Sequence, residues 1–450
     1  MANASITAPA DSPDAPLSLH HPSFAELLRV FARIGVLSFG GPAGQIALMH
    51  RELVDERRWI DEDSYLHALN FCHLLPGPEA QQLATWIGWR LHGLRGGLAA
   101  GLLFVLPGAF VILALSMLYG FAARLDWFAA LFLGIKAAVL AVVAQALMRV
   151  AGRALNTRFK QGLAVLAFAG LFLFDLPFPL VVITAGLAGM AVAKARPQWL
   201  GIKPADSDGP LGPRPWGQSL RALLAWAAIW AAPMALVLFT LGRGHVLWEI
   251  GAFFSQLAVV TFGGAYAVLA YMAQEAVQGH GWLSASEMAD GLGLAETTPG
   301  PLIMVTQFVG YLAAFRAPEP FSPLVAGVLG AALTTWVTFA PCFLWIFTFA
   351  PWITRIERAR SLKGGLASLT AAVVGVIANL AAWFVLHVLF ARVAERQAGP
   401  LRLHVPDWTS FDWRAGVLTA LALLLIFRWK WNVIAVLGLS ALLGLALARL

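Results

Sequence analysis

The tripeptide Pro-Gly-Pro occurs twice inside long apolar stretches, as Pro76-Gly77-Pro78 and Pro299-Gly300-Pro301. Each proline removes a backbone donor and disfavours helix in the residue before it, so a continuous helix does not pass through either copy. Unpaired backbone groups are costly in hydrocarbon, and broken helices persist at membrane depth only where protein or a watery cavity surrounds them. The helix that restarts after each second proline directs free N–H groups into the break, where an anion is favoured. We therefore expect an anion site at the two breaks.

The composition indicates a membrane protein. Hydrophobic residues make up 59% of the chain and charged residues 12%, against roughly 45–50% and about 25% in soluble domains. Three apolar runs, Gly97–Leu118, Phe128–Met148 and Leu324–Phe349, reach the ~20 residues of a membrane-spanning helix. The net charge of +7 lies in short loops between spans, which favours a topological role over nucleic-acid binding. Cys72 and Cys342 lie in apolar surroundings, so neither a disulfide framework, a thiolate metal site nor a cofactor is expected.

The second half of the sequence repeats the first half. The offset between equivalent positions is constant at first, as from Trp59 to Trp282, and it becomes larger after a longer loop, as from Pro107 to Pro341. Four landmarks share the first offset: Ser38-Phe39-Gly40-Gly41 with Thr261-Phe262-Gly263-Gly264, Glu52 with Glu275, Trp59 with Trp282, and Pro76-Gly77-Pro78 with Pro299-Gly300-Pro301. The repeat predicts a first repeat at 23–195, a linker at 196–247 with one extra span near 220–241, and a second repeat at 248–450. Residues 1–22 lack Lys and Arg and are rich in Ala, Ser, Asp and Pro, which predicts a disordered tail.

Six predicted spans per repeat, with one span between the repeats, place the two copies in opposite orientations. Basic loops at Arg149–Lys160, Lys194–Arg214 and Arg355–Lys363 are predicted to be cytoplasmic by the positive-inside rule. The N-terminus is then cytoplasmic and the C-terminus periplasmic. The predicted fold is an all-α polytopic membrane protein of two inverted-topology repeats, with about 13 transmembrane helices and discontinuous helices at the Gly-Gly and Pro-Gly-Pro breaks.

Inverted repeats with discontinuous helices are typical of secondary transporters, whose substrate lies near the midplane of the membrane. A helix terminus contributes only ~0.3–2 kcal/mol toward an anion, whereas burial of a bare ion costs tens of kcal/mol. The site therefore has to be wet or to hold a fixed cation. The candidates are Arg33, one turn after Arg29, and Lys136 in the middle of a span. The alternatives are a cytoplasmic anchor for Arg33 and a snorkelling or carbonyl-paired side chain for Lys136.

Polar residues next to the first break are further candidates. Glu79 follows Pro78 and either couples a proton or stabilises the helix start as an ordinary first-turn acid. Gln81 either lines the route of an anion or bonds between helices. His67, Asn70 and His73 share one helical face, but no HExxH motif or carboxylate partner accompanies them, so no metal site is expected.

Taken together, the duplicated Ser/Thr-Phe-Gly-Gly motif, the tryptophan before the second span and the paired Pro-Gly-Pro motifs resemble the chromate ion transporter family in its long, two-domain bacterial form. The resemblance implies a multi-pass protein of the bacterial plasma membrane that exports chromate by secondary active transport and confers chromate resistance. The family motifs fall on Phe39, Gly40, Gly41, Pro76, Gly77, Pro78, Phe262, Gly263, Gly264, Pro299, Gly300 and Pro301. The second repeat departs from the first at Ala265 and Leu302, so the two breaks need not be equivalent.

Two alternative functions stay open at this point. One is an importer or exchanger of sulfate or another oxyanion with the same architecture, because chromate and sulfate are both tetrahedral dianions with the same acceptors. The other is an intramembrane enzyme, which needs a nucleophile–base or metal constellation that the sequence does not display, so a non-enzymatic role is predicted. The expected partners are chromate, sulfate as a second substrate, and membrane lipid, with a homodimer as a further option.

Overall fold

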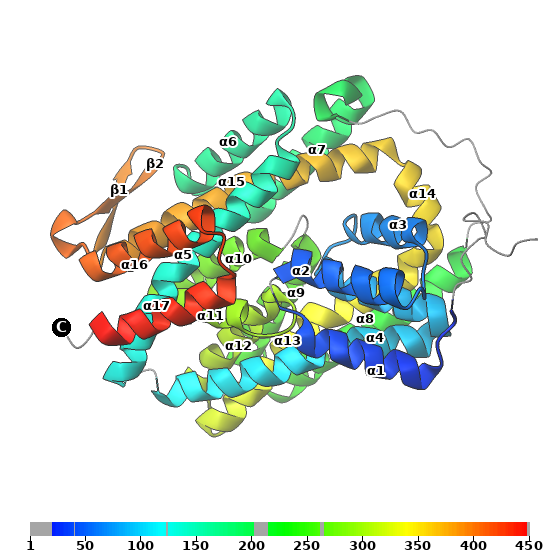
Figure 1. The fold of residues 1–450 in the computed structure, drawn as a ribbon, viewed down its shortest axis with the longest axis horizontal. Coiled ribbons are helices and arrows are strands. Elements are labelled where there is room, and N and C mark those ends of the chain that lie inside the picture. The colour runs from blue at the N-terminus through cyan, green and yellow to red at the C-terminus, as the bar shows by residue number, and fades with distance from the viewer. Residues whose placement is uncertain (1–19, 40, 123–124, 202–214, 262–264, 448–450) are drawn as a thin grey trace, which may run out of the picture.

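The computed structural model describes residues 20–39, 41–122, 125–201, 215–261 and 265–447, and these are mostly helical (Figure 1). Six helices in this part of the chain are long and apolar enough to cross a membrane, and shorter apolar helices accompany them. The protein is thus a polytopic helical membrane protein, as predicted.

The first half of the chain begins with short helices, and its longest helices are α4 and α5. Its elements are α1 (Phe24–Leu37), α2 (Gly41–His50), η1 (Arg51–Glu56), α3 (Glu62–Cys72), α4 (Glu79–Ala122), α5 (Asp126–Ala154), α6 (Arg158–Phe172), α7 (Phe178–Ala195) and η2 (Pro197–Leu200). Backbone angles outside the helical region at His92 and Gly93 divide α4 into two parts, 79–91 and 94–122.

The second half follows the same order after one additional helix, α8 (Trp216–Thr240). Its elements are α9 (Val246–Val260), α10 (Ala265–Gln274), η3 (Glu275–Gly279), α11 (Ala285–Thr297), η4 (Leu302–Met304), α12 (Val305–Arg316), α13 (Pro323–Phe349), η5 (Ala350–Trp352), α14 (Ile353–Arg358), α15 (Arg360–Leu389), β1 (Val393–Ala398), β2 (Leu401–Pro406), η6 (Trp408–Ser410), α16 (Trp413–Leu423), η7 (Leu424–Arg428) and α17 (Val433–Leu447).

The same local signals start equivalent helices in the two halves. The Asp61 carboxylate accepts a hydrogen bond from the Ser64 amide at 2.8 Å and begins α3. At the equivalent position, the Ser284 hydroxyl accepts from the Glu287 amide at 3.2 Å and begins α11. A short polar side chain at the N-cap satisfies an amide that the helix leaves unpaired.

In the first half, the short helices are paired as hairpins. The His20 amide, before α1, donates to the Arg58 carbonyl, after η1, at 3.0 Å, so α1 and α2 return to the face from which they start. The His92 ring, which follows 79–91, has its Nε2 2.9 Å from the Pro22 carbonyl oxygen. Therefore α3 and the first part of α4 form a second hairpin, whose tip is the Pro-Gly-Pro break. We call the end of the molecule that carries these contacts the first face.

The second half contains the same two hairpins. Arg316, at the end of α12, donates to the Trp282 carbonyl before α11 at 2.7 Å. His245, before α9, has its Nε2 2.8 Å from the Glu319 carbonyl oxygen, in the loop after α12. The contacts close α9 with α10 and α11 with α12 at a common end, which we call the second face.

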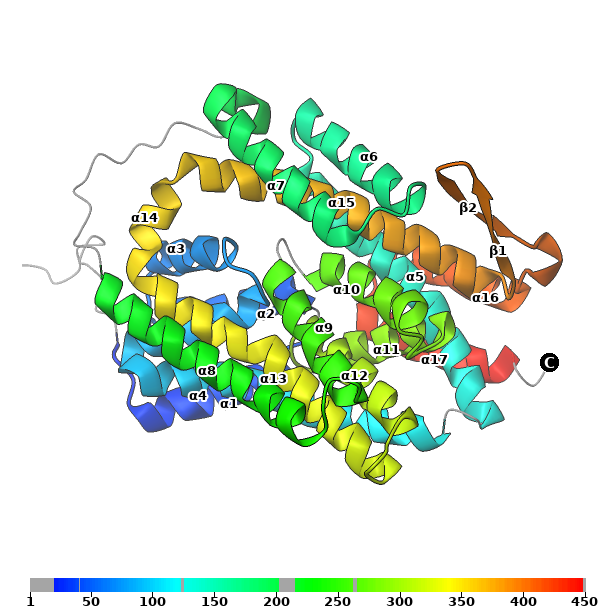
Figure 2. The ribbon, with the colours of Figure 1, turned by 180° about the vertical axis from the view of Figure 1, so that it is seen from behind.

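The two faces lie at opposite ends of α4. Residues 94–122 begin beside His92 at the first face and end where the Phe121 ring contacts the Phe315 ring at 5.5 Å, next to Arg316. At 1.5 Å per residue this part of α4 is about 43 Å long, more than the ~30 Å of a bilayer core. The hairpins of the two halves therefore point toward each other from opposite faces, and their tips meet in the middle of the molecule (Figures 1 and 2).

The structure differs from the predicted count of 13 separate spans. Six spans per repeat require the segment around each Gly-Gly break and the segment around each Pro-Gly-Pro break to cross once, but each of these segments reverses at its break. A Gly-Gly or Pro-Gly-Pro break allows reversal as readily as continuation, and apolar length does not distinguish the two. The all-α prediction also misses the antiparallel pair of β1 and β2 at the second face.

The two halves are interlocked through their long helices. Helix α5 packs against α16 and α17 of the second half, whereas α15 packs against α6 and α7 of the first half. Small residues allow these contacts, because a Cβ at Gly134 would overlap the Ser440 backbone and a Cβ at Gly189 would overlap the Gly364 backbone. Figure 2 shows α15 alongside α6 and α7. This framework joins the two halves outside the hairpins.

Candidate functional site

The hairpin tips of the two halves are joined by two equivalent backbone hydrogen bonds. The Gly77 amide donates to the Thr261 carbonyl at 2.8 Å, and the Gly300 amide donates to the Ser38 carbonyl at 2.8 Å. Each Pro-Gly-Pro break thus binds the residue that precedes the Phe-Gly-Gly motif of the other half. The structure brings together Phe39, Gly41 and both Pro-Gly-Pro segments, whereas Gly40, Phe262, Gly263 and Gly264 lie outside the described residues.

Only glycine suits the centre of each break. Gly77 and Gly300 have φ angles of +114° and +96°, which L side chains rarely adopt. A Cβ at Gly77 would lie 3.0 Å from the Cys342 sulfur, and a Cβ at Gly300 would lie 3.1 Å from the Gly108 Cα. Gly108 and Cys342 are themselves equivalent positions of the repeat, related by the same offset as Pro107 and Pro341. The requirement for close approach therefore recurs in both halves.

The breaks do not offer all the free amides that the sequence predicts. The Gly77 and Gly300 amides already have carbonyl acceptors, so they are not available to an anion. The backbone N–H groups that stay available to an anion are instead those in the first turn of each helix that starts at the tips. Four helices begin there, α2, α4, α10 and, through η4, α12, so four positive dipole ends converge on the centre instead of the predicted two.

The first turn of α4 carries three buried polar side chains, Glu79, Gln81 and Gln82. Gln82 donates to the Pro76 carbonyl at 2.6 Å and closes the break. Gln81 is fully buried, yet neither atom of its amide has a hydrogen-bond partner among the described residues. An unsatisfied buried amide costs about 1–3 kcal/mol, so Gln81 marks a place where water or a ligand belongs.

Further neutral polar groups lie at the tips. Gln45, on α2, donates to the Gly300 carbonyl at 2.6 Å, while its own Oε1 and the Ser38 hydroxyl have no partner in the described part of the chain. Gln307, on α12, donates to the Ala109 carbonyl at 3.0 Å, and its Oε1 is likewise unpartnered there. Gln45 was not predicted from the sequence, although a glutamine within an apolar segment just after the Gly-Gly motif was an available signal.

Arg33 lies away from the breaks. Its side chain is 57% exposed, and its Nε lies 3.7 Å from the buried carboxylate of Glu52. Glu52 bonds more closely to Arg57, at 2.5 Å. This placement favours the anchoring interpretation of Arg33 over a role at the anion site.

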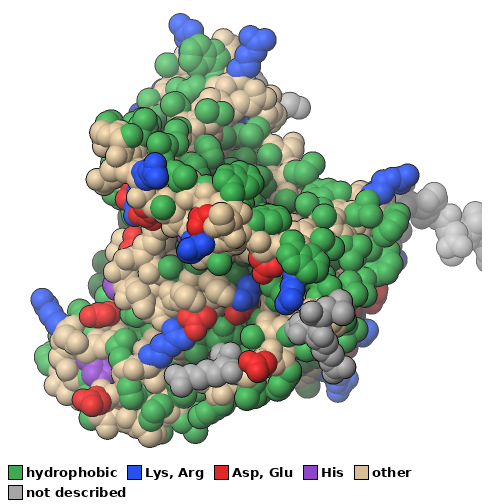
Figure 3. Space-filling view, turned by 90° about the vertical axis from the view of Figure 1, so that its left-hand side faces the viewer, with side chains coloured by type: hydrophobic (Ala, Val, Ile, Leu, Met, Phe, Trp, Pro, Cys, Tyr) green, Lys and Arg blue, Asp and Glu red, His purple; other side chains and the backbone are tan. Residues whose placement is uncertain are grey.

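Lys136 joins the two halves near the second face. Its ammonium lies 3.3 Å from an Asp290 oxygen and donates to the Ser286 hydroxyl, and the other Asp290 oxygen accepts from Tyr119 at 2.6 Å. These side chains line a cavity of about 360 Å³. Figure 3, a view of the end that carries β1 and β2, shows acidic and basic side chains next to one another across its middle. Asp290 was not predicted from the sequence, although it is an acid within the apolar stretch before the second break.

His67 and Asn70 on α3 and His73, its C-cap residue, are all exposed. Within the described ranges, no group of three or more His, Cys, Asp or Glu residues is placed to hold a metal ion. The three side chains form an exposed polar stripe, and its His73 end lies three residues before Pro76 in the sequence.

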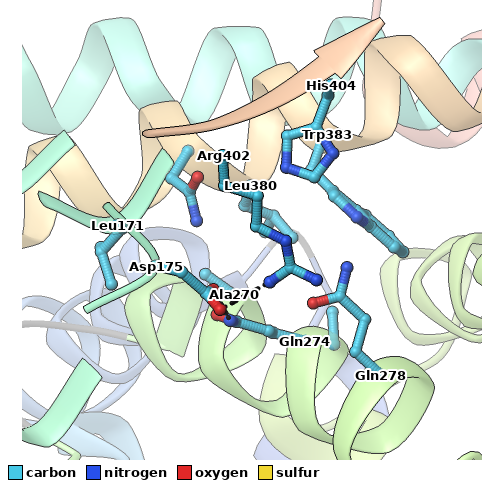
Figure 4. A pocket seen from close by; sticks show the side chains of 11 residues that line it. Leu171, Asp175, Ala270, Gln274, Gln278, Leu380, Trp383, Arg402 and His404 are labelled. Carbon is cyan, nitrogen blue, oxygen red and sulfur yellow. Dashed lines mark hydrogen bonds and ion pairs between the residues drawn. The ribbon is translucent and has the colours of Figure 1, made fainter. Parts of the chain in front are cut away.

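A small pocket lies under β2 at the second face (Figure 4). Arg402 points into it and bonds to Asp175 at 2.6 Å and to Glu395 at 2.5 Å, while Gln274 donates to Asp175 at 3.2 Å. The cavity measures about 30 Å³, room for about two water molecules. Because its guanidinium is neutralised by two carboxylates, Arg402 ties the strands to the loop between α6 and α7 and offers no free charge to an anion.

The fold and the site define a class: a polytopic helical membrane protein in which broken helices from two opposed halves meet around a buried polar centre. The chain belongs to the chromate transporter family, since the family model described as "Chromate transporter" matches residues 25–190 and 248–445. It is therefore a transporter, and the predicted family is confirmed.

Proteins of several organisms are similar to this chain. It is 32% identical over 362 residues to the chromate transport protein of Pseudomonas aeruginosa, covering 79% of each chain. It is 28% identical to the probable chromate transport protein of Synechococcus elongatus, over 80% of this chain and 84% of the relative. An uncharacterized transporter of Methanocaldococcus jannaschii is 24% identical over 94% of both chains. No solved structure matches the chain.

Proposed function

We propose that this protein is a secondary active transporter that exports chromate across the bacterial plasma membrane and thereby gives chromate resistance. The observation that carries the proposal is the meeting of four helix N-termini with the unpartnered side-chain amide of Gln81 at the joined hairpin tips, within the described part of the chain. The names of the relatives add chromate as the substrate.

The tips suit a tetrahedral dianion. Chromate presents only acceptor oxygens, and the tips provide donors from first-turn amides and from the Nε2 of Gln81. A Cβ at Gly41 would meet no atom within 4 Å, so there is room for an anion beside this residue. Neutral donors hold a dianion without a permanent counter-charge, so release costs less than release from a buried lysine or arginine. Sulfate offers the same acceptors and is the alternative substrate.

The proposed membrane topology keeps the two halves inverted. In each half, the crossings are those of 94–122, α5, α6 and α7 or their counterparts, and α8 adds one more crossing between the halves. The hairpins return to the side from which they enter, so they do not change the orientation of the later helices. Because the loop after α5 and the segment after α7 are rich in lysine and arginine, the first face is cytoplasmic. Asp175 and Glu395 offset Arg402 at the opposite face.

The membrane potential favours export. A negative-inside potential of ~100 mV contributes about 2.3 kcal/mol per charge to the exit of an anion. The decisive experiment measures uptake of radioactive chromate into everted membrane vesicles with and without the protein. Accumulation that depends on the protein supports export, whereas protein-dependent uptake only in right-side-out vesicles contradicts it. Parallel measurements with radioactive sulfate separate the alternative substrate.

A further inference from the structure

The hairpins of the two halves differ in how deeply they are packed. On α11, every residue from Met288 to Glu296 is buried, and the helix packs against α5 and α15. The equivalent helix α3 packs against α4 and α14, and it leaves His67, Asn70 and His73 exposed. The two halves therefore depart from their own symmetry in one respect: α11 is docked between the long helices and α3 is not.

Polar side chains predominate on the exposed side of α3, where His67, Asn70 and His73 lie and Leu66 is the exposed apolar residue. Elsewhere the exposed surface of the bundle is apolar, as on α8, where Leu224 is 62% and Phe239 85% exposed, as expected of a lipid-facing helix. The stripe of His67, Asn70 and His73 is unsuited to lipid because each side chain carries hydrogen-bonding groups. It runs along α3 from the first face nearly to Pro76, on the side where α3 lacks the extensive contact with α15 that α11 makes with α5. We call this the open side.

The opposite side is closed by a contact between the halves. Lys136 of α5 bonds to Asp290 and Ser286 of α11, and Tyr119 of α4 bonds to the same aspartate. One turn further along α11, a Cβ at Gly293 would overlap the Ile135 side chain, so the two helices touch there. The ion pair and the close contact together seal α11 against α5 between the second face and the breaks.

The repeat identifies the corresponding residues on the open side. The offset that relates Trp59 to Trp282 also relates His67 to Asp290 and Asn70 to Gly293. The larger offset of the later part of the repeat relates Lys136 to Thr370. Thr370 lies on α15. Helix α11 packs against α5, but α3 makes no equally extensive contact with α15. The open side thus has a histidine and a threonine where the closed side has an ion pair, and an asparagine where close packing requires a glycine.

We infer that the Lys136–Asp290 pair is the closed gate of an alternating-access transporter, and that the other state docks α3 on α15 through His67 and Thr370. The inference rests on the proposed transport function and adds its gates. In inverted-repeat transporters the two states exchange the conformations of the two repeats around a fixed site. The ion pair biases this protein toward the state open at the first face, and the weaker contact of His67 with Thr370 lets that face reopen.

The test measures accessibility, which needs no transported substrate. His73→Cys places a thiol deep in the open stripe, and the native Cys72 and Cys342 are fully buried, so a polar maleimide reports on this position in purified protein in nanodiscs. Asp290→Asn breaks the gate at the second face, and the labelling rate is expected to fall at least about fivefold, as a modest coupling free energy permits. The charge-reversed pair K136D/D290K is expected to restore the original rate.

A second variant builds the missing gate instead. H67D/T370K places an aspartate and a lysine on the open side, and it too is expected to lower labelling of His73→Cys at least about fivefold. His67→Asp and Thr370→Lys alone are the matched controls and are expected to have smaller effects. Asn70→Gly, which imitates Gly293, is expected to lower labelling further.

Labelling that stays the same in folded Asp290→Asn and in H67D/T370K would overturn the inference. An equal decrease in the double variant and in either single variant would also overturn it, because a gate needs both partners. Since His67 is exposed and Thr370 is half-buried, the double variant remains informative even where Asp290→Asn does not fold. If the protein transported no chromate but the labelling rates changed as expected, the proposed substrate would be wrong and the inference about the gates would still hold.

Discussion

The amide of Gly77 and the carbonyl of Thr261 are 2.8 Å apart, and Gly300 and Ser38 repeat this bond at the same distance. The paired residues come from different halves, so the central amide of each break has its acceptor in the other half. In hydrocarbon, unsatisfied backbone groups are costly. The central site therefore exists only when both halves are folded against each other.

Replacement of the break glycines is expected to have unequal effects. Both substitutions by alanine force a positive φ on an L residue, at about 1–3 kcal/mol. The new Cβ at position 300 meets the Gly108 backbone, which cannot move easily, whereas at position 77 it meets the ends of Gln82 and Cys342 side chains. Gly300→Ala is expected to lower the melting temperature and chromate export more than Gly77→Ala does. Melting in detergent and vesicle flux measure the two effects; an equal loss in both variants contradicts the packing at Gly108.

Gln81 is expected to matter for transport and not for folding. Its amide has no partner in the described part of the chain, so Gln81→Leu removes an unsatisfied buried group and is expected to leave the melting temperature equal or higher. The same variant is expected to lower chromate flux at least about tenfold, as the loss of one hydrogen bond to a charged ligand of about 1.5–3 kcal/mol implies.

Gln82→Leu is the matched control for this prediction. It removes the bond to the Pro76 carbonyl, so it is expected to lower the melting temperature as well as the flux. If Gln81→Leu destabilised the protein as strongly as Gln82→Leu, then Gln81 would be a structural residue.

The buried carboxylate of Glu52 leads to a contrast between two arginines. Arg57 lies 2.5 Å from Glu52, whereas Arg33 is 3.7 Å away and largely exposed. Removal of one partner from a buried pair costs about 3–5 kcal/mol, so Arg57→Ala is expected to reduce the yield of folded protein strongly. Arg33→Ala is expected to fold and to transport nearly normally. If the Arg33→Ala variant folded normally but lost chromate flux, Arg33 would be assigned to the anion site.

The equivalence of the two halves could be predicted from the sequence, whereas the number of times that each half crosses the membrane could not. Constant offsets located both breaks and their glycines, because close backbone contact tolerates no other residue. The hairpins were not predictable, since α1 and α2 together have the apolar length of one span. The Lys136–Asp290 pair was also out of reach, because it depends on α5 of one half packing against α11 of the other. Long-range contacts of this kind leave no periodic signal in either helix.

His404 in β2 is expected to make the strand pair sensitive to acid. Burial lowers the pKa of its ring in the folded protein, so the unfolded segment takes up a proton more readily than the folded one. The stability of β1 and β2 is then fully present above pH ~6.5 and decreases as the pH falls below that value. The protection factors of residues 393–406, which are their hydrogen-exchange rates relative to the unprotected rate at the same pH, measure this at a pH of about 7.5 and of about 5.5, on either side of the ordinary histidine pKa. His404→Gln is expected to abolish the difference, and an undiminished difference in that variant assigns the sensitivity to another group.

Glu79 has two candidate roles, proton coupling and stabilisation of the helix start. It is buried in the first turn of α4, beside the proposed anion site, where an ionised carboxylate would repel a dianion. If Glu79 takes up a proton when chromate binds and releases it afterwards, then Glu79→Gln is expected to transport at a rate that no longer varies with pH, because its amide imitates the protonated acid. If it only stabilises the helix start, the variant keeps the full pH dependence and loses about 0.3–1 kcal/mol of stability. Flux at several pH values, with an imposed pH gradient and without one, separates the two roles.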